Sequence, residues 1–364
     1  MTIATRQPSD KASRGFQASF VRVLPDTVSA RGLSADPVWA ALGLRPDHIT
    51  DGARIPAAAL SQALEIASEL TGELQIALHA AQAVRPLHLG SLGYALMSSA
   101  VGEDGLRMFE RFQTLLCDEF LAQHRVVKGL IEIRHEPIDI PLPRHVAFWW
   151  FLVGARLSFA RWVYGRRDLV PVRIDLPCPR PAPAQADIFD RFVGIAVRYD
   201  TPDCRELMPA DWLAWLNPNA DPAMHQLMAT RTAQQLAQRP SGDTMLMRAR
   251  LVLAEHMRQG IELHLEGVTH AVAASDAQWA GVTPRQLQKR LAEQGLSFKE
   301  LVEEVRRERA LRLLRDTARS IGEIAQDCGY TEVSPFHRAV RRWTGLTPLQ
   351  VRQQALSGHD TEQT

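Results

Sequence analysis

Residues 281–291 read GVTPRQLQKRL, and residues 329–340 read GYTEVSPFHRAV. Both stretches begin with Gly-x-Thr and continue into a polar, basic segment whose apolar residues have helical spacing. In the first stretch, Thr283 precedes a proline and is followed three positions later by Gln286. This combination is typical of a helix N-terminus, because the threonine and glutamine satisfy free amide groups there and proline has none to satisfy. The repeat predicts two helices that begin alike, the second at Thr331.

Further helix starts of the same kind follow the first one. They are Ser297 to Glu300, Ser320 to Glu323 and Thr347 to Gln350. Together with Thr283, these signals predict four separate helices that begin at residues 283, 297, 320 and 347.

The second repeat has the layout of a helix–turn–helix. A short helix with Ile324 and Ala325 inward is followed by a glycine turn at 328–330 and by a helix with Phe336 and Val340 inward. Such a unit lays its second helix into the major groove of DNA. Residues 283–352 also hold fourteen Lys or Arg against nine Asp or Glu, a net charge of about +5 that suits a phosphate-facing surface. The segment therefore predicts DNA binding.

Composition limits what the rest of the chain can be. Its 364 residues suffice for two domains, and 46% hydrophobic with 23% charged residues is typical of a globular protein. Only four of the 42 cationic residues are lysines, so the positive charge is mostly arginine, whose planar fork suits phosphates and guanine edges.

No metal, cofactor or membrane segment is expected. The cysteines at 117, 178, 204 and 328 are too far apart for a zinc motif, and no nucleotide-binding or hydrolase motif occurs. The first fifteen residues are polar, which predicts no secretory signal. The most apolar window, residues 145–155, is about half as long as a membrane span and is interpreted as a buried helix.

Residues 1–238 mix helical and strand patterns, which predicts an α+β fold. A hairpin is expected around Lys128 and Gly129. Helices are expected near 55–72, 73–84, 90–99, 103–116, 143–165 and 184–193, and short strands near 169–177, 196–200 and 204–208.

A domain boundary is expected at residues 238–243, QRPSGD, which place Pro, Ser, Gly and Asp between two helical patterns. The predicted division is a tail at 1–20, an α+β regulatory domain at 21–238, a linker at 239–243, an all-α DNA-binding domain at 244–355 and a tail at 356–364.

Residues 268–352 resemble the DNA-binding domain of the AraC/XylS family of bacterial transcription regulators, and the text from 281 to 352 carries the resemblance. It implies two helix–turn–helix units joined by a long helix at about 298–315, with one recognition helix in each unit. Gln288 then corresponds to His337, and Lys289 to Arg338. Contacts to bases are implied for Arg285, Gln288, Lys289, Val333, Ser334, His337 and Arg338, and contacts to the DNA backbone for Thr283, Arg290, Thr331, Arg341 and Arg342.

The first unit departs from the family pattern in its leading helix. Asp276-Ala277 stands where an apolar residue and alanine are usual, as in Ile324-Ala325 of the second unit. This difference puts the packing of the first leading helix in doubt.

The connecting helix has an apolar stripe and charged residues around it. Its pairs Glu303 to Arg307 and Glu308 to Arg312 have the spacing of stabilising i,i+4 ion pairs. Arginines 306, 307 and 309 are interpreted as part of a solvated, ion-paired face, with contact to DNA as the alternative.

Residues 55–238 resemble the arabinose-binding type of regulatory domain found in one branch of the family, on residues 55–72, 89–99 and 177–202. The resemblance implies an effector-sensing, dimerising domain, and the domain's name does not imply a sugar. Candidate effector-binding residues surround the long helix and a glycine-rich turn: Arg85, His88, Tyr94, Met97, Trp149, Trp150, Arg156 and Trp162. The tryptophans can equally be core residues.

The helix expected at 222–238 has an apolar edge formed by Met224, Leu227 and Met228. This edge either meets a partner helix in a homodimer or packs on its own domain.

The resemblance implies a transcription regulator, not an enzyme, that responds to a small-molecule effector and activates a neighbouring metabolic operon. Its implied partners are double-stranded promoter DNA, RNA polymerase and a second copy, in the bacterial cytoplasm at the nucleoid. Two alternatives stay open: a ligand-independent DNA-binding protein, and a DNA-tethered enzyme using His79, His88, Cys117 or His124.

Overall fold

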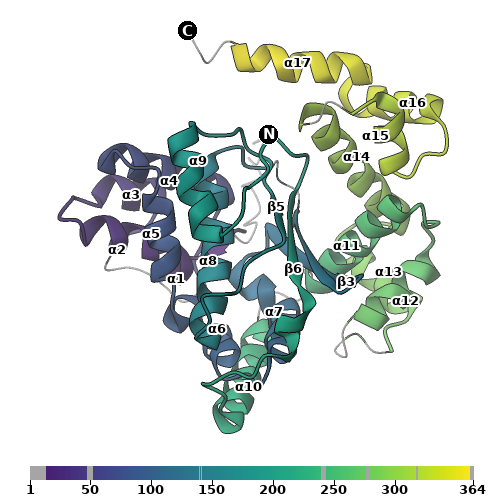
Figure 1. The fold of residues 1–364 in the computed structure, drawn as a ribbon. Helices are drawn as coiled ribbons and strands as arrows, with labels where there is room; N and C mark the ends of the chain where they lie inside the picture. The colour runs from purple at the N-terminus through teal and green to yellow at the C-terminus, as the bar shows by residue number, and fades with distance from the viewer. Residues whose placement is uncertain are drawn as a thin grey trace, which may run out of the picture.

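The structure is a computed structural model that describes residues 14–46, 52–138, 140, 142–238, 243–275, 279, 281–316 and 319–360. Figure 1 shows an N-terminal part that combines helices with a sheet, coloured purple to teal, and a helical C-terminal part, coloured green to yellow. The predicted order of an α+β domain followed by an all-α domain is confirmed.

The N-terminal domain is built around one antiparallel sheet of four strands. The strand order is β3 (Phe120–Val127), β4 (Leu130–Pro137), β6 (Cys204–Pro209) and β5 (Arg173–Asp175). A separate strand pair joins β1 (Phe16–Gln17) to β2 (Arg54–Ile55). The expected strand at 196–200 is reduced to one bridge between Arg198 and Asp175.

Helices form the rest of this domain, and the longest, α8 (Val146–Tyr164), is the apolar helix predicted near 143–165. The others are α1 (Ala18–Val21), α2 (Val23–Ser29), α3 (Asp36–Ala41), α4 (Ala57–Thr71), α5 (Ile76–Ala83), α6 (Gly90–Met97), α7 (Gly102–Leu116), α9 (Pro183–Val193) and α10 (Pro222–Gln238), with the 3₁₀ turns η1 (Pro86–Leu89) and η2 (Ala210–Ala214).

The predicted hairpin is present, and its turn explains the Lys-Gly pair. Lys128 has φ 51° and Gly129 has φ 76°, the left-handed conformations that a tight two-residue hairpin turn requires. Strands β3 and β4 therefore pair directly outward from the turn, and Ala122 lies opposite His135.

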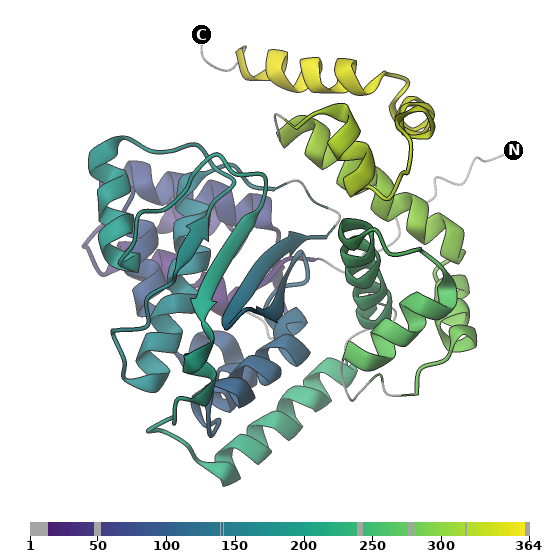
Figure 2. The same ribbon diagram turned by 45° about the vertical axis from the view of Figure 1, so that its right-hand side comes forward.

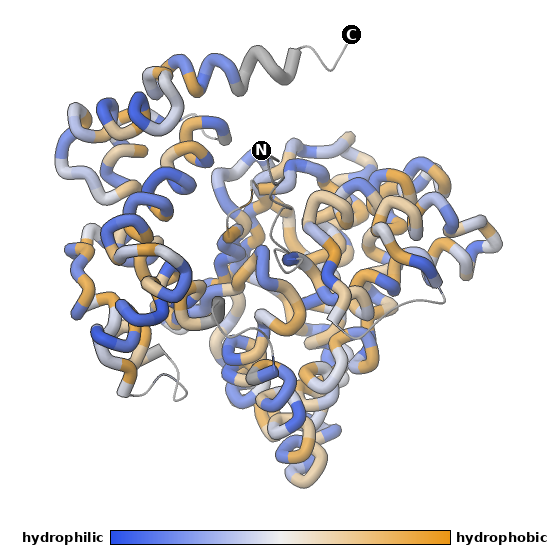
Figure 3. Tube along the Cα trace, turned by 180° about the vertical axis from the view of Figure 1, so that it is seen from behind, coloured by the Kyte–Doolittle hydropathy of each residue, from blue (hydrophilic) through white to orange (hydrophobic). Residues whose placement is uncertain are grey.

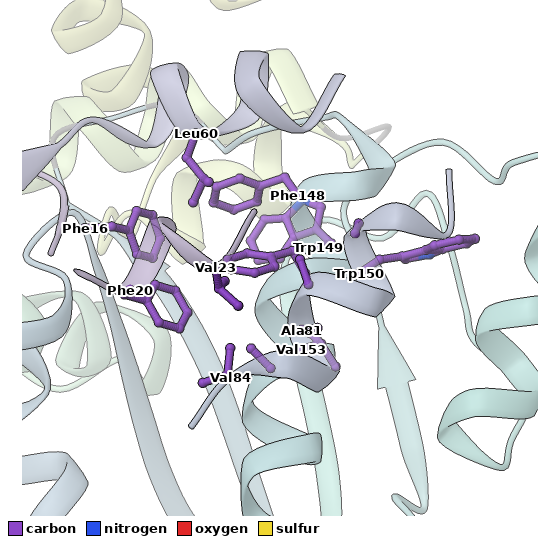
Figure 4. Packing of buried hydrophobic residues seen from close by; sticks show 14 of the residues in the cluster. Phe16, Phe20, Val23, Leu60, Ala81, Val84, Phe148, Trp149, Trp150 and Val153 are labelled. Carbon is purple, nitrogen blue, oxygen red and sulfur yellow. The ribbon is translucent and has the colours of Figure 1, made fainter. Parts of the chain in front are cut away.

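Residues 14–20 belong to the fold, so the prediction of a tail as far as residue 20 is wrong for this segment. Phe16 and Phe20 are only 1% and 3% exposed. Their rings stack on each other and meet Phe148 and Phe151 of α8, as Figure 4 shows for Phe16 and Phe148. Burial of two phenyl rings draws this short segment into the core.

The C-terminal domain consists of two small helical bundles that share one long helix, α14 (Phe298–Asp316). Leu301 and Val305 of α14 enter the first hydrophobic cluster, and Ala310 and Leu314 enter the second. Figure 3 shows hydrophilic and hydrophobic residues alternating along these helices, as amphipathic packing requires. The other helices are α11 (Asp243–Gln259), α12 (Leu265–Ser275), α13 (Pro284–Glu293), α15 (Ile321–Asp327), α16 (Val333–Thr344) and α17 (Pro348–Asp360).

All four predicted helix starts form their capping hydrogen bonds. At each start, the Ser or Thr hydroxyl accepts from the third helical amide while the Gln or Glu side chain accepts from the cap amide. The expected start at Thr331 is wrong, because α16 begins at Val333 after an extended Glu332. The two glycines of the repeat, Gly281 and Gly329, share the left-handed conformation.

The predicted boundaries of the C-terminal domain can be compared with the structure only in part. Helix α17 continues to Asp360, into the segment expected to be a tail. Residues 239–242 of the expected linker, and residues 276–278 at the doubtful start of the first unit, lie outside the described residues.

The glutamates of the two ion pairs expected along α14 make contacts with other helices. Glu303 pairs with Arg342 of α16, and Glu308 lies 3.5 Å from Arg250 of α11. Arg306 and Arg309 turn inward and donate to the carbonyl oxygens of Gly329 (3.3 Å) and Asp327 (2.7 Å).

The solvated-face interpretation is therefore wrong for Arg306 and Arg309, while Arg307 is exposed. The physical reason is that a helix leaves unpaired carbonyl groups at its C-terminus. The end of α15 packs on α14, and these two guanidiniums supply donors to it.

Truncating Phe336 should destabilise the second bundle. Phe336 is fully buried in the second hydrophobic cluster, so Phe336→Ala should lower the free energy of unfolding by about 3–5 kcal/mol. Val333→Ala, on the same helix but 41% exposed, is the control and should cost less than about 1 kcal/mol. Urea unfolding followed by circular dichroism measures both, and equal losses would contradict the assignment.

Candidate nucleic-acid interface and ligand pocket

Helix α13 presents a polar face over an apolar one. Leu287 and Leu291 are buried in the first cluster, whereas Arg285, Gln288 and Lys289 are exposed. A capping box at Thr283 fixes where the helix begins. The arrangement places two cations and an amide on one solvent-facing surface.

Helix α16 repeats this arrangement in the second bundle. Phe336 and Val340 are buried, Ser334 and Arg338 are exposed, and His337 is half-buried. Figure 1 and Figure 2 both place α13 and α16 in the part of the molecule away from the sheet.

Residues expected to contact the DNA backbone have different surroundings. Arg341 and Thr331 are exposed. Arg290 forms an ion pair with Glu293 at 2.9 Å, and Arg342 forms one with Glu303. These two arginines would have to exchange a carboxylate for a phosphate on binding DNA.

A largely apolar cavity lies inside the N-terminal domain. Its volume is about 150 Å³, the size of an engineered cavity known to admit benzene. Helices α7 and α8, strands β3 and β4, and the N-terminal Phe16 and Phe20 line it. Such a cavity suits a small ligand with an apolar body.

One side of this cavity is polar. Glu206 is fully buried and accepts hydrogen bonds from Arg156 (3.0 Å to Oε1), with the His135 ring nitrogen 2.9 Å away. Burial alone would raise the pKa of Glu206, but Arg156 and His135 outweigh it and lower the pKa to about 2. Arg156 and His135 line the cavity and both contact Glu206, so a polar ligand group can address these two side chains.

His124 and Cys117 also line the cavity, yet their chemistry does not favour a hydrolase. Burial lowers the pKa of His124, against the opposing effect of Glu110 at 2.9 Å. Burial raises the pKa of the Cys117 thiol to about 12, so the thiol is neutral near pH 7, whereas a nucleophile must be a thiolate.

Of the expected effector-binding residues, Arg156 lines this cavity. Trp149 and Trp150 are fully buried core residues whose ring nitrogens donate to the Pro143 carbonyl (2.7 Å) and the Tyr199 hydroxyl (3.3 Å). They lie in the core because α8 is buried on nearly all sides.

The remaining expected residues are not in the cavity wall: Arg85, His88, Tyr94 and Met97 lie at η1 and α6, and Trp162 lies on α8. Arg85 lies over the Trp162 ring, and its backbone amide donates to His88 Nδ1 at 2.9 Å. Tyr94 is 37% exposed, and Met97 is half-buried.

Most residues of the cavity wall were not among the residues predicted from the sequence to bind the effector. Alternate residues of the hairpin face it: Phe120, Ala122, His124, Ile133 and His135. The period-two spacing around Lys128-Gly129 is the signal that could have identified them, since alternate strand residues share a face.

The other face of the hairpin contacts the C-terminal domain. Leu121 packs with Met247 and Leu251 of α11. Gln123 accepts a hydrogen bond from Arg258 of α11 at 2.9 Å. Figure 1 and Figure 2 both show α11 beside the hairpin.

Glu136 is the charged centre of this contact. It forms an ion pair with Arg258 of α11 and lies 3.8 Å from Arg312 of α14. Burial would raise the pKa of Glu136, but Arg258, Arg312 and Arg309 outweigh burial and lower it to about 2. One carboxylate of the N-terminal domain thus holds two helices of the C-terminal domain.

The described part of the chain lacks candidate metal sites, disulfides and membrane-spanning helices. Its residues contain no group of three or more potential metal ligands, and its four cysteines are buried and unpaired. None of the described helices has the length and apolar character needed to cross a bilayer.

Comparison with known proteins gives matches to both domains. Residues 32–216, about half of the chain, match the family described as "Arabinose-binding domain of AraC transcription regulator, N-term". Residues 277–354 match the family described as "Helix-turn-helix domain". These are families of transcription regulators, not of enzymes.

Individual relatives are similar to much of the chain. The ornithine utilization regulator of Pseudomonas aeruginosa is 26% identical over 96% of this chain and 99% of its own length. The regulator VqsM of the same organism is 28% identical over 46% of this chain and 50% of its own length. The crystal structure of the P. aeruginosa regulator CdpR covers 91% of this chain and 97% of its own, at 22% identity and a TM-score of 0.41.

The family match spans half of the chain and agrees with the two-part architecture. The chain therefore belongs to the AraC family of DNA-binding transcription regulators, with an N-terminal effector-binding domain and a C-terminal helix–turn–helix domain.

Proposed function

We propose that this regulator recognises promoter DNA through α13 and α16 and responds to a small ligand bound in the N-terminal cavity. The observation that carries the proposal is the pair of helices with exposed polar faces, each seated on its own hydrophobic cluster and joined by α14. Two rigidly based recognition helices can address two successive segments of a major groove.

The base-contacting set is Arg285, Gln288 and Lys289 on α13 with Val333, Ser334, His337 and Arg338 on α16. Arginine and lysine pair with guanine edges, and glutamine pairs with adenine. The exposure of most of these side chains supports the assignment. Thr283, Arg290, Thr331, Arg341 and Arg342 hold the phosphates.

The effector has an apolar body the size of one ring or a short acyl chain, and one polar group. The mostly apolar lining and the volume of about 150 Å³ support this ligand class. Its polar group meets the Arg156–Glu206–His135 cluster. A free amino acid, with two charges, fits this cavity less well because a buried charge needs a partner.

The hairpin β3–β4 carries the signal from the ligand to the DNA-binding domain. Ala122 and His135 face the cavity, while Leu121 and Glu136 contact α11. A ligand that displaces one face of the hairpin therefore displaces the other face. The ligand changes DNA binding to the extent that it binds one arrangement of the hairpin and the DNA-binding domain more tightly than the other.

The finer features of the family resemblance belong to the same proposal. The protein acts as a homodimer in the bacterial cytoplasm and activates a neighbouring metabolic operon through RNA polymerase. Helix α10 packs on α6 yet leaves Met224 37% and Leu227 60% exposed. This exposed edge supports α10 as the dimer helix.

Arg338→Ala should lower affinity for the operator by about 1–3 kcal/mol and relax preference at one or two base pairs. Arg341→Ala, on the same exposed helix, should weaken binding to all sequences alike, because a phosphate contact has no base preference. Selection of binding sites with each variant measures both effects. Identical site logos for wild type and Arg338→Ala would contradict the assignment.

Ala160→Leu should weaken ligand binding, because Ala160 lines the cavity from α8 and a larger side chain occupies part of it. The tryptophan fluorescence of the wild type should change on titration with benzoate or octanoate, since Trp212 also lines the cavity. The affinity of Ala160→Leu should fall by at least about tenfold, or ~1.4 kcal/mol. The control is Ala184→Leu, an exposed position on α9. Unchanged titration of Ala160→Leu would exclude this cavity.

Met224→Glu/Leu227→Glu should reduce the molecular mass of the protein in solution from dimer to monomer. Two carboxylates on the exposed edge of α10 would have to lose their water on forming a helix–helix interface. Light scattering measures the mass. A double variant that keeps the wild-type mass would show that α10 is not the dimer helix.

A further inference from the structure

A second, polar cavity lies between the two domains. Its volume is about 240 Å³, several times the 10–15 Å³ or so that one buried water requires. Strand β4 of the N-terminal domain forms one wall, and α11, α14 and the ends of α15 form the other. It is separate from the apolar cavity, although His135 borders both.

Arginine dominates this interdomain cavity. Four carboxylates of described residues line it, against six guanidiniums: Arg125, Arg134, Arg258, Arg309, Arg312 and Arg319. Both domains contribute, since the first two arginines belong to the hairpin and the other four to the DNA-binding domain. Positive charge therefore exceeds negative charge on the wall.

The arginines nearest the hairpin and at α15 have carboxylate partners. Arg134 pairs with Asp203 and with Glu132, each at 2.9 Å. Arg319 pairs with Asp327.

Two arginines of α14 are less well compensated. Arg309 is 7% exposed, and the bond described for it is from Nε to the backbone carbonyl of Asp327. Arg312 has its described carboxylate contact at 3.8 Å, to Glu136, which Arg258 already engages more closely. Burial and the neighbouring Arg312 lower the pKa of Arg309 to about 10. Among the described ion pairs none involves Arg309, and Arg312 shares its carboxylate, Glu136, with Arg258.

We propose that the interdomain cavity is a binding site for a small anion bearing a diphosphate group, held by Arg309 and Arg312 of α14 and by Arg134 of β4, which would exchange its Asp203 partner for a phosphate oxygen. Phosphate oxygens suit the planar fork of arginine, which forms two parallel hydrogen bonds to them. A diphosphate has enough charge to compensate the buried Arg309 and the half-buried Arg312 at once. The recognition helices form no part of this site, and among the described lining residues it shares only His135 with the apolar cavity.

An anion in this cavity touches both domains. It binds only when the DNA-binding domain is docked on the hairpin, so it stabilises the docked arrangement in proportion to its concentration. The cavity would then make the regulator sensitive to a phosphorylated metabolite in addition to its effector.

The test is calorimetric titration of the full-length protein with sodium diphosphate, and separately with adenosine diphosphate, at constant ionic strength. Binding of diphosphate is expected. Binding of adenosine diphosphate as well would show that the site takes the group as part of a nucleotide, and its absence would identify the free anion. Failure of both to bind would overturn the proposal.

Variants separate this site from other basic surfaces. Arg312→Gln should weaken diphosphate binding at least about tenfold, and Arg312→Lys should weaken it less, because lysine keeps the charge but not the fork. The matched control is Arg338→Gln, which removes an arginine from α16 and should leave diphosphate affinity unchanged. Circular dichroism checks that each variant is folded. Loss of binding in the control, or full binding in Arg312→Gln, would place the anion elsewhere and overturn the proposal.

Discussion

The β3–β4 hairpin is the element on which both domains depend. Antiparallel strands commonly leave one face to solvent, but here the half of the hairpin away from its turn is covered on both faces. Alternate residues such as Ala122 and His135 close the apolar cavity, while Leu121 and Glu136 meet the DNA-binding domain. Because alternate side chains are fixed to one backbone, neither face can move without the other. The geometry of a pleated strand pair thus links the apolar cavity to the DNA-binding domain.

The contact between domains is polar at its centre, and this has a physical consequence. The apolar part of it is small, formed by Leu121, Ile138, Met247 and Leu251. A buried ion pair such as Glu136 with Arg258 adds little net stability, since both charges lose their water, but it fixes one geometry. An interface of this kind holds a defined arrangement without making separation of the domains prohibitive.

One helix, α14, packs into both bundles of the DNA-binding domain. Arg306 and Arg309 reach from α14 to the carbonyl groups at the end of α15, and Arg306 also lies over the Tyr330 ring. These contacts fix the conformation of the short turn between α15 and α16. Arginines that a linear pattern assigns to solvent therefore position a recognition helix, because a buried helix end has to find hydrogen-bond donors.

The sequence by itself determined the features that depend on neighbouring residues. The capping boxes at 283, 297, 320 and 347, the Lys128-Gly129 turn and the two helix–turn–helix units are local, because each is decided within a few residues of the chain. Tertiary structure alone decided the rest. Whether Trp149 lines a cavity or the core, and whether Arg309 meets solvent or a helix end, depends on segments far away in the sequence. Likewise Glu136 meets Arg258 across 122 positions of chain. Such contacts leave no periodic signal, because packing brings the partners together only after the local elements have formed.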